Sequence, residues 1–170
     1  MGILMEIRGE YFVIKPVDEN DISDIFNVYK QCEDFLSLGP VSHASKQMVL
    51  DDLKLSKDEG GIFCGIFIGA EMIGIVDFVE NNYESNPEEA YLSLLMIAKT
   101  HRNKGIGKDV VNVVESVIRK NANIKTILAG VQVNNKSAID FWNKMGYKIV
   151  SGPKFMPDTT IVYDLKKDLT

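Results

Sequence analysis

Residues 101–108 read HRNKGIGK, a basic stretch with two glycines one residue apart. An apolar run, YLSLLMIA at 91–98, precedes it, and valines and isoleucine at helical spacing over 110–118 follow it. A helix that begins here exposes unpaired N–H groups and the positive end of its dipole. Gly105 and Gly107 let a ligand approach the main chain closely. Three side chains add positive charge: Arg102, Lys104 and Lys108. The stretch therefore predicts a site for a phosphate or diphosphate.

Two common phosphate-binding motifs do not fit these residues. A Walker loop needs glycine at position 102 and Ser or Thr at 109, where the chain has Arg102 and Asp109. A dinucleotide fingerprint needs glycine at position 110, which is Val110. Two alternatives stay open at this point: another nucleotide bound at the glycine turn, or a turn that only carries a solvated basic rim.

The rest of the chain predicts a mixed α/β (α+β) fold. Apolar runs predict strands at 11–17, 61–68, 72–80, 90–98, 125–133, 147–150 and 159–165. Apolar residues at helical spacing predict helices over 22–29, 45–57, 110–118 and 138–145. The middle three strands follow one another without a helix, whereas helices separate the others. We therefore expect a mixed, mostly antiparallel central sheet of about seven strands, with helices on both faces.

Two motifs together resemble a known family. Arg-x-x-Gly-x-Gly after a strand, here residues 102–107, resembles the acyl-CoA signature of the GNAT superfamily of N-acetyltransferases. Residues 133–147, VNNKSAIDFWNKMGY, are similar to that family's V-N-x-x-(S/A)-x-x-(F/L)-(Y/W)-x-x-x-G-(F/Y) segment. The resemblance implies the GNAT fold over a single domain, residues 1–170, and direct transfer of acetyl from acetyl-CoA to a primary amine of a small molecule or peptide.

The resemblance also implies where acetyl-CoA binds. The diphosphate should lie on backbone N–H groups from Arg102 to Lys108. The preceding strand should bulge near Leu95–Ile97 and pair with the pantetheine arm, and the N–H near Ile97 should face the thioester carbonyl. The full set of expected cofactor-binding residues is Leu95, Met96, Ile97, Arg102, Asn103, Lys104, Gly105, Ile106, Gly107, Lys108, Asn134 and Trp142.

Trp142 departs from the family pattern. Many members have a tyrosine there as general acid for the leaving thiolate, and an indole N–H cannot serve as a useful acid. Tyr147, Tyr83 or water could take this role, and Trp142 could also be a core residue. The residues we assign as catalytic are Ile97, Glu80 and Tyr147.

The acceptor amine is protonated at neutral pH and must lose a proton before attack. Candidates for the group that removes it are Asp77, Glu80, Glu89 and Ser93. Strand alternation places Tyr91, Ser93, Leu95 and Ile97 on one face. We assign substrate binding to Phe35, Asp77, Tyr91 and Ser93, with His43 and Phe155 as further candidates for the pocket wall.

Composition also bears on nucleic-acid binding, membrane insertion, metal binding and location. The net charge of −5 does not favour nucleic-acid binding, although residues 101–170 are basic and residues 1–100 acidic. Glu71 interrupts the most apolar region, so we expect no membrane span, and the short apolar start is not a signal peptide. Two histidines and two apolar-flanked cysteines predict no metal site and a reducing, cytoplasmic setting. A monomer or a homodimer is possible, and a CoA-binding regulatory module is the alternative to an enzyme.

Overall fold

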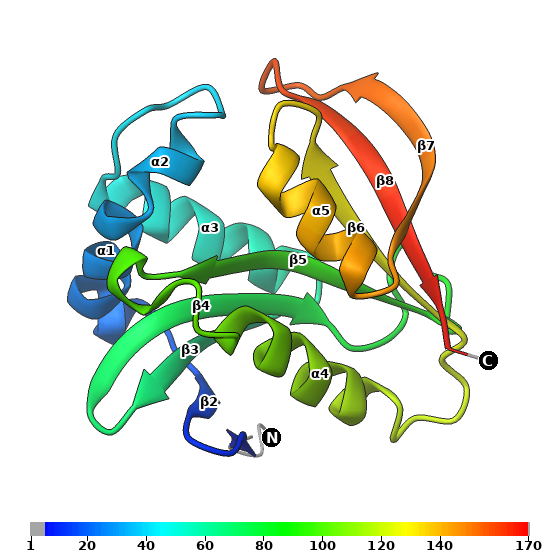
Figure 1. Cartoon of the computed structure of the whole chain (residues 1–170), viewed down its shortest axis with the longest axis horizontal. Helices are drawn as coiled ribbons and strands as arrows, with labels where there is room; N and C mark the ends of the chain where they lie inside the picture. Colours follow the sequence, from blue (N-terminus) through cyan, green and yellow to red (C-terminus); the bar gives the residue numbers. More distant parts are fainter. Residues whose placement is uncertain (1–5, 170) are drawn as a thin grey trace.

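The computed structural model describes residues 6–169 (Figure 1). The start of the chain, where we predict no signal peptide, lies largely outside these residues. A sheet of eight strands forms the centre of the molecule, in the order β1-β2-β3-β4-β5-β6-β8-β7. All neighbours run antiparallel except β5 and β6, which run parallel. The predicted mixed, mostly antiparallel sheet is therefore confirmed.

The strands are β1 (Ile7–Arg8), β2 (Val13–Pro16), β3 (Ile62–Ile68), β4 (Glu71–Val79), β5 (Glu89–Ile97), β6 (Thr126–Gln132), β7 (Lys148–Phe155) and β8 (Ile161–Asp168). The count is one more than expected, because two-residue β1 is too short to carry an alternation pattern. Strand β7 continues across Gly152, where we expected a loop. It does so through two irregularities in its register with β8.

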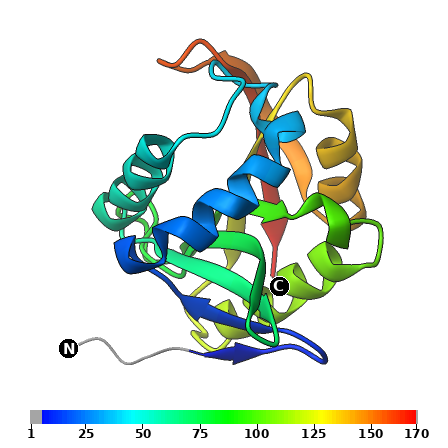
Figure 2. The same cartoon turned by 90° about the vertical axis from the view of Figure 1, so that its left-hand side faces the viewer.

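The helices are α1 (Ile22–Gln31), α2 (Glu33–Leu36), α3 (Lys46–Asp58), α4 (Ile106–Ile118) and α5 (Lys136–Lys144), with 3₁₀ turns η1 (Glu19–Asp21) and η2 (Lys99–His101). Helices α1 and α3 pack on one face of the sheet, and α4 and α5 on the other (Figures 1 and 2). Each face has its own hydrophobic core, so helices cover both faces as predicted. Within residues 6–169 no helix has the length and apolar character needed to cross a bilayer.

Helix α4 shows why packing rather than propensity forms this element. Val110, Val111 and Val114 are buried against the sheet. Valine is a poor helix former in isolation, so the stability of α4 comes mainly from burying this apolar face. The helix begins at Gly105, whose φ of 80° lies in the left-handed region that favours glycine. The sheet therefore fixes where the glycine-rich turn stands.

Strands β5 and β6 pair only at their beginnings. Their register runs from Glu89–Thr126 to Leu92–Ala129 and ends there. The remainder of β5 is paired with β4 alone. The C-terminal halves of the two parallel strands thus diverge, and this opening positions the site.

A bulge in β5 lies at Ser93, between the pairs Phe78–Leu92 and Asp77–Leu94. We expected a bulge near Leu95–Ile97, so that position was wrong. The extra residue reverses the alternation of side chains beyond it. Leu92 therefore shares the α4-side core with Leu95 and Ile97, whereas Leu94 and Met96 pack against the α1-side core. The predicted common face of Tyr91, Ser93, Leu95 and Ile97 does not exist.

Candidate active site

A cleft of about 1320 Å³ opens where β5 and β6 diverge. Its walls include β5, β6, the turn before α4, α5 along its length, α2, and parts of β7 and β8. The predicted site residues that line it are Phe35, Tyr91, Ser93, Leu95, Met96, Ile97, Arg102, Asn103, Gly105, Ile106, Gly107, Lys108, Asn134 and Trp142. Four others are not in its lining: Asp77, Glu80, Lys104 and Tyr147.

The turn before α4 presents a row of main-chain donors to this cleft. Among residues 6–169, the N–H groups of residues 103–108 find no hydrogen-bond acceptor. Asn103 has a positive φ of 62° and Gly105 one of 80°, which turns the chain sharply before the helix. Lys108, in the first turn of α4, lines the cleft as well. Free N–H groups, the helix dipole and a lysine together fit a diphosphate.

The free edge of β5 offers a second set of main-chain groups. The Ala98 N–H donates to Ile73 O on β4 at 2.8 Å, so Ala98 directs its backbone groups toward β4. Because these directions alternate along an antiparallel strand, the N–H groups of Leu95 and Ile97 face the opening toward β6. An extended ligand lying in the opening could therefore pair with β5 as an additional strand would.

Arg102 does not direct its charge into the turn. Its Nε donates to the Ile97 carbonyl at 2.9 Å, and its two terminal nitrogens donate to both carboxylate oxygens of Asp34. The Arg102 guanidinium holds the pKa of Asp34 below its usual range. The side-chain charge that we had assigned to phosphate binding is thus largely neutralised within the protein.

Asp77 lies just behind the floor of the cleft and is only 5% exposed. Ser56 Oγ donates to its Oδ1 at 2.7 Å, and Ser93 Oγ donates to its Oδ2 at 3.4 Å. Burial raises the pKa of Asp77 to about 6, with smaller contributions from the negative charges of Glu59 and Asp52, while the two serine hydrogen bonds act in the opposite direction. Ser93 lines the cleft, so its hydroxyl connects Asp77 with the cleft.

Two tyrosines stack at the same end of the cleft. The rings of Tyr83 and Tyr91 lie 4.3 Å apart and nearly parallel, and both residues line the cleft. Burial raises the pKa of Tyr91 to about 12, assisted by the nearby charge of Glu59. Burial likewise raises the pKa of Tyr83. Both hydroxyls therefore stay protonated at neutral pH and can act as hydrogen-bond donors.

The structure corrects two of the residues that we assigned as catalytic. Tyr147 is fully buried and donates its hydroxyl proton to Glu115 Oε2 at 2.7 Å. Lys167 Nζ also contacts Glu115, at 2.8 Å, which completes a buried polar cluster between α4 and β8. Glu80 is exposed at the end of β4, outside the cleft. Neither side chain reaches the opening between β5 and β6, so we no longer propose either as catalytic.

Trp142 has the core position that the apolar face of its helix suggested. It is 8% exposed and packs edge to face against Phe141 and Tyr147, at centroid distances of 5.2 and 5.0 Å. One part of the residue still lines the cleft. Trp142 can thus support the cleft wall by packing, but it cannot act as a general acid.

The sequence patterns did not indicate a loop that reaches the end of β6. Asn134 Nδ2 donates to the Leu38 carbonyl at 3.3 Å, which joins the segment after α2 to the segment before α5. Gln132 lines the cleft beside them, and its Oε1 is buried without a hydrogen-bond partner within residues 6–169. The one sequence signal for a role of Gln132 is that this polar residue ends an otherwise apolar strand. This oxygen can accept a hydrogen bond from a ligand.

Both cysteines are buried and free. Cys32 lines the cleft, which we did not predict, and its Sγ donates to the Ile97 carbonyl at 3.5 Å. Burial raises the pKa of Cys32, and it raises that of Cys64 to about 12. A thiol with a raised pKa is a poor nucleophile at neutral pH, so neither residue suits a covalent acetyl intermediate.

The sequence and the fold were compared with those of known proteins. The zebrafish (Danio rerio) protein N-alpha-acetyltransferase 50 is 32% identical over 73 residues, which are 43% of this chain and 44% of that protein. The chain thus spans less than half the length of this curated relative. An acetyltransferase from Thermus thermophilus has a similar structure, with a TM-score of 0.77, 22% identity, and coverage of 97% of this chain and 100% of that one.

Another solved structure is spermidine N-acetyltransferase from Vibrio cholerae in complex with CoA and spermine. It matches with a TM-score of 0.70 and 16% identity over 93% of this chain and 95% of that one. At these identities the two structures establish a shared fold. The model of the acetyltransferase (GNAT) family matches residues 22–147, most of the chain. The chain therefore belongs to the GNAT family of acetyltransferases.

Proposed function

We propose that this protein is an N-acetyltransferase that moves the acetyl group of acetyl-CoA directly to a primary amine. The observation that carries the proposal is the opening between β5 and β6, which begins at the free N–H groups of residues 103–108 and ends beside Ser93 and Asp77. A diphosphate site and a buried carboxylate at the two ends of one cleft suit a long cofactor that delivers its acyl group to an amine.

The main chain would hold acetyl-CoA at both ends of the opening. The N–H groups of residues 103–108 bind the diphosphate, with Lys108 nearby. The N–H of Ile97 pairs with the pantetheine arm. The N–H of Leu95 lies closer along β5 to Asp77 than that of Ile97 does. We therefore assign to Leu95, rather than Ile97, the hydrogen bond that stabilises negative charge on the thioester oxygen.

Asp77 would act as the general base through Ser93. The acceptor ammonium loses a proton to the Ser93 hydroxyl while Ser93 passes its own proton to Asp77. With a pKa of about 6, Asp77 is ionised at neutral pH and still basic enough to accept that proton. The amine then attacks the thioester carbon, the carbon–sulfur bond breaks, and the thiolate leaves. The second proton of the nitrogen passes to this thiolate, so the products are the neutral amide and the CoA thiol. The Tyr91 hydroxyl, protonated in the cleft, can donate a hydrogen bond to the leaving sulfur.

The charges of the cleft favour a peptide α-amine over a polyamine. Of the carboxylates in its lining, Asp34 is paired with Arg102, and Asp164 with Lys154. Glu84 is in no ion pair within residues 6–169. A polyamine carries several charges that one free carboxylate and Asp77 cannot balance. The similarity to an N-alpha-acetyltransferase points in the same direction.

Transfer of radiolabel from acetyl-CoA tests the proposal. The acceptor panel contains short peptides with free N-termini, the same peptides with blocked N-termini, and spermidine. Labelling of the free peptides, weaker labelling of spermidine and none of the blocked peptides is expected. Tight CoA binding with no labelling of any acceptor would favour a binding module instead.

A further inference from the structure

The carbonyl of Ile97 is held by side chains although it faces the opening. Arg102 Nε donates to it at 2.9 Å, and Cys32 Sγ approaches it at 3.5 Å. The next N–H along the chain, that of Ala98, donates to Ile73 O at 2.8 Å. The peptide unit between Ile97 and Ala98 is thus fixed from both sides, by β4 on one and by Arg102 on the other.

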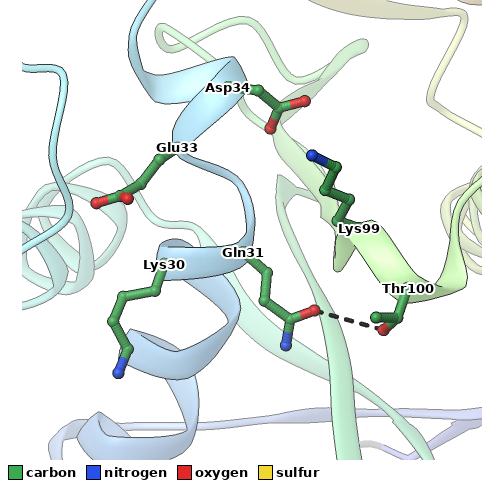
Figure 3. Close-up of a pocket in the computed structure, with 6 residues that line it drawn as sticks. All are labelled: Lys30, Gln31, Glu33, Asp34, Lys99 and Thr100. Carbon is green, nitrogen blue, oxygen red and sulfur yellow. Dashed lines mark hydrogen bonds between the residues drawn. The ribbon is translucent and has the colours of Figure 1, made fainter.

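Asp34 holds Arg102 in this position. The two terminal nitrogens of the guanidinium donate to the two carboxylate oxygens, a bidentate arrangement that fixes the plane of the group. The Arg102 side chain is 29% exposed and that of Asp34 53%, so the arginine is the more shielded of the two partners. Asp34 and Lys99 also line a second pocket, of about 670 Å³. Figure 3 shows that Lys99 points toward the Asp34 carboxylate there. Arg102 and Lys99 together thus keep Asp34 ionised, because both lower its pKa.

We propose that Asp34 and Arg102 are positioning residues that keep the end of β5 open for the cofactor arm. The β5–β6 ladder ends at Leu92, and with its carbonyl bonded to Arg102, Ile97 offers no free acceptor with which β6 could pair at the far end of β5. The end of β5 is thus held apart from β6 by contacts within the protein. This inference rests on the proposed function, and it gives the arginine of the glycine-rich motif a role other than phosphate binding.

A truncated donor distinguishes the two roles of Arg102. S-acetyl-pantetheine contains the arm and the thioester but has no diphosphate. If Arg102 positions β5, Arg102→Gln lowers kcat/KM for acetyl-CoA and for S-acetyl-pantetheine by the same factor, about 10-fold to 100-fold. If Arg102 binds phosphate, only the value for acetyl-CoA falls, and that result overturns the proposal.

Asp34 provides the test of coupling. Asp34→Asn should reproduce most of the Arg102→Gln effect on kcat/KM, through kcat, with the Kd for CoA changed by less than about threefold, because the diphosphate is held by main chain. The double variant should be no worse than the poorer single variant. Asp58→Asn, which breaks an exposed ion pair with Lys54, is the matched control and should leave kcat unchanged. Additive losses in the double variant would contradict the proposal.

A spectroscopic measurement keeps the inference testable if no acceptor is found. In the free protein the Arg102 Nε–H should give a slowly exchanging NMR signal. Asp34→Asn should accelerate its exchange about 10-fold or more and shift the Ile97 and Ala98 amide signals. Unchanged exchange and unchanged shifts would show that Asp34 does not hold the arginine, whatever the enzyme acetylates.

Discussion

The Ser93 hydroxyl donates a 3.4 Å hydrogen bond to Oδ2 of Asp77, which links a residue of the cleft to a carboxylate behind its floor. The bulge in β5 makes this link possible, because the extra residue at Ser93 turns the hydroxyl toward β4 at the Asp77–Leu94 pair. Ser56, from α3, holds the other carboxylate oxygen at 2.7 Å. The carboxylate is thus oriented by two serines, and only one of them reaches the cleft.

Asp77→Asn should lower kcat about 100-fold or more, because the amide cannot accept the proton of the acceptor. In the unsubstituted enzyme kcat/KM should rise as the pH increases through about 6, the pKa of Asp77. The measurement is a pH–rate profile between pH 5 and 8 for both proteins. A profile that keeps this rise in Asp77→Asn would assign it to another group.

The same substitution should stabilise the fold at neutral pH. The pKa of Asp77 is about 6 in the folded protein and 3.8 for an ordinary aspartate, so the folded state binds this proton more tightly. The contribution of Asp77 to the free energy of unfolding therefore falls as the pH rises from about 4 to about 6. Above that range the full destabilisation from burying its charge is present. Asp77→Asn should raise the free energy of unfolding at pH 7 by up to about 3 kcal/mol. Urea unfolding at pH 4 and pH 7 checks this, and a gain at pH 4 as large as that at pH 7 would contradict it.

Gly105→Ala should weaken acetyl-CoA binding, because a methyl group would stand where the diphosphate approaches the main chain. Gly60→Ala is the matched control. Both glycines have a positive φ, 80° and 77°, and a Cβ built at either has no neighbour within 4 Å. The two variants should lose similar stability, about 1 kcal/mol, while only Gly105→Ala raises the KM for acetyl-CoA, about 10-fold. An equal KM in the two variants would argue against close approach at Gly105.

Lys108→Ala should raise the KM for acetyl-CoA several-fold at low salt and less at high salt, since the lysine adds a screened attraction to the diphosphate. Lys104→Ala should have a smaller effect, because Lys108 lines the cleft and Lys104 does not. Steady-state kinetics at two ionic strengths measure both. Equal effects of the two substitutions would mean that general positive charge, rather than position, attracts the cofactor.

Tyr147→Phe should affect stability rather than catalysis. The substitution removes the hydrogen bond to Glu115 and leaves that carboxylate with Lys167 alone. We expect a loss of about 1–2 kcal/mol in the free energy of unfolding, with kcat within about twofold of the original. Tyr91→Phe, whose ring lines the cleft, is the contrasting variant and should lower kcat. A large fall in kcat for Tyr147→Phe would restore the catalytic role that we withdrew.

Local patterns predicted the elements and the turn at residues 102–108, because glycine, helical valine spacing and apolar runs act over a few residues. They could not predict the bulge at Ser93. A bulge depends on the register between β4 and β5, and one extra residue is enough to exchange the faces of Leu94 and Leu95. Tyr147 was misassigned for a related reason. Glu115 is 32 positions from Tyr147 and 52 positions from Lys167, and only the folded chain brings the three together.

Arg102 shows that the sequence also could not indicate which charges are paired within the fold. From the sequence, Arg102 is one of three basic residues near the glycines, together with Lys104 and Lys108. Its partner Asp34 is 68 positions away, and the pairing removes most of its charge from the turn. Charge along a segment thus predicts a basic turn, but it does not indicate which of the cations there is already paired within the protein.

In the proposed mechanism, main-chain N–H groups of residues 103–108 bind the diphosphate of CoA. The most direct test is a titration of ¹⁵N-labelled protein with CoA, followed by two-dimensional NMR. The amide signals of Ile106, Gly107 and Lys108 should show the largest changes, together with those of Leu95 and Ile97. Binding of CoA that leaves all of these signals in place would contradict the account.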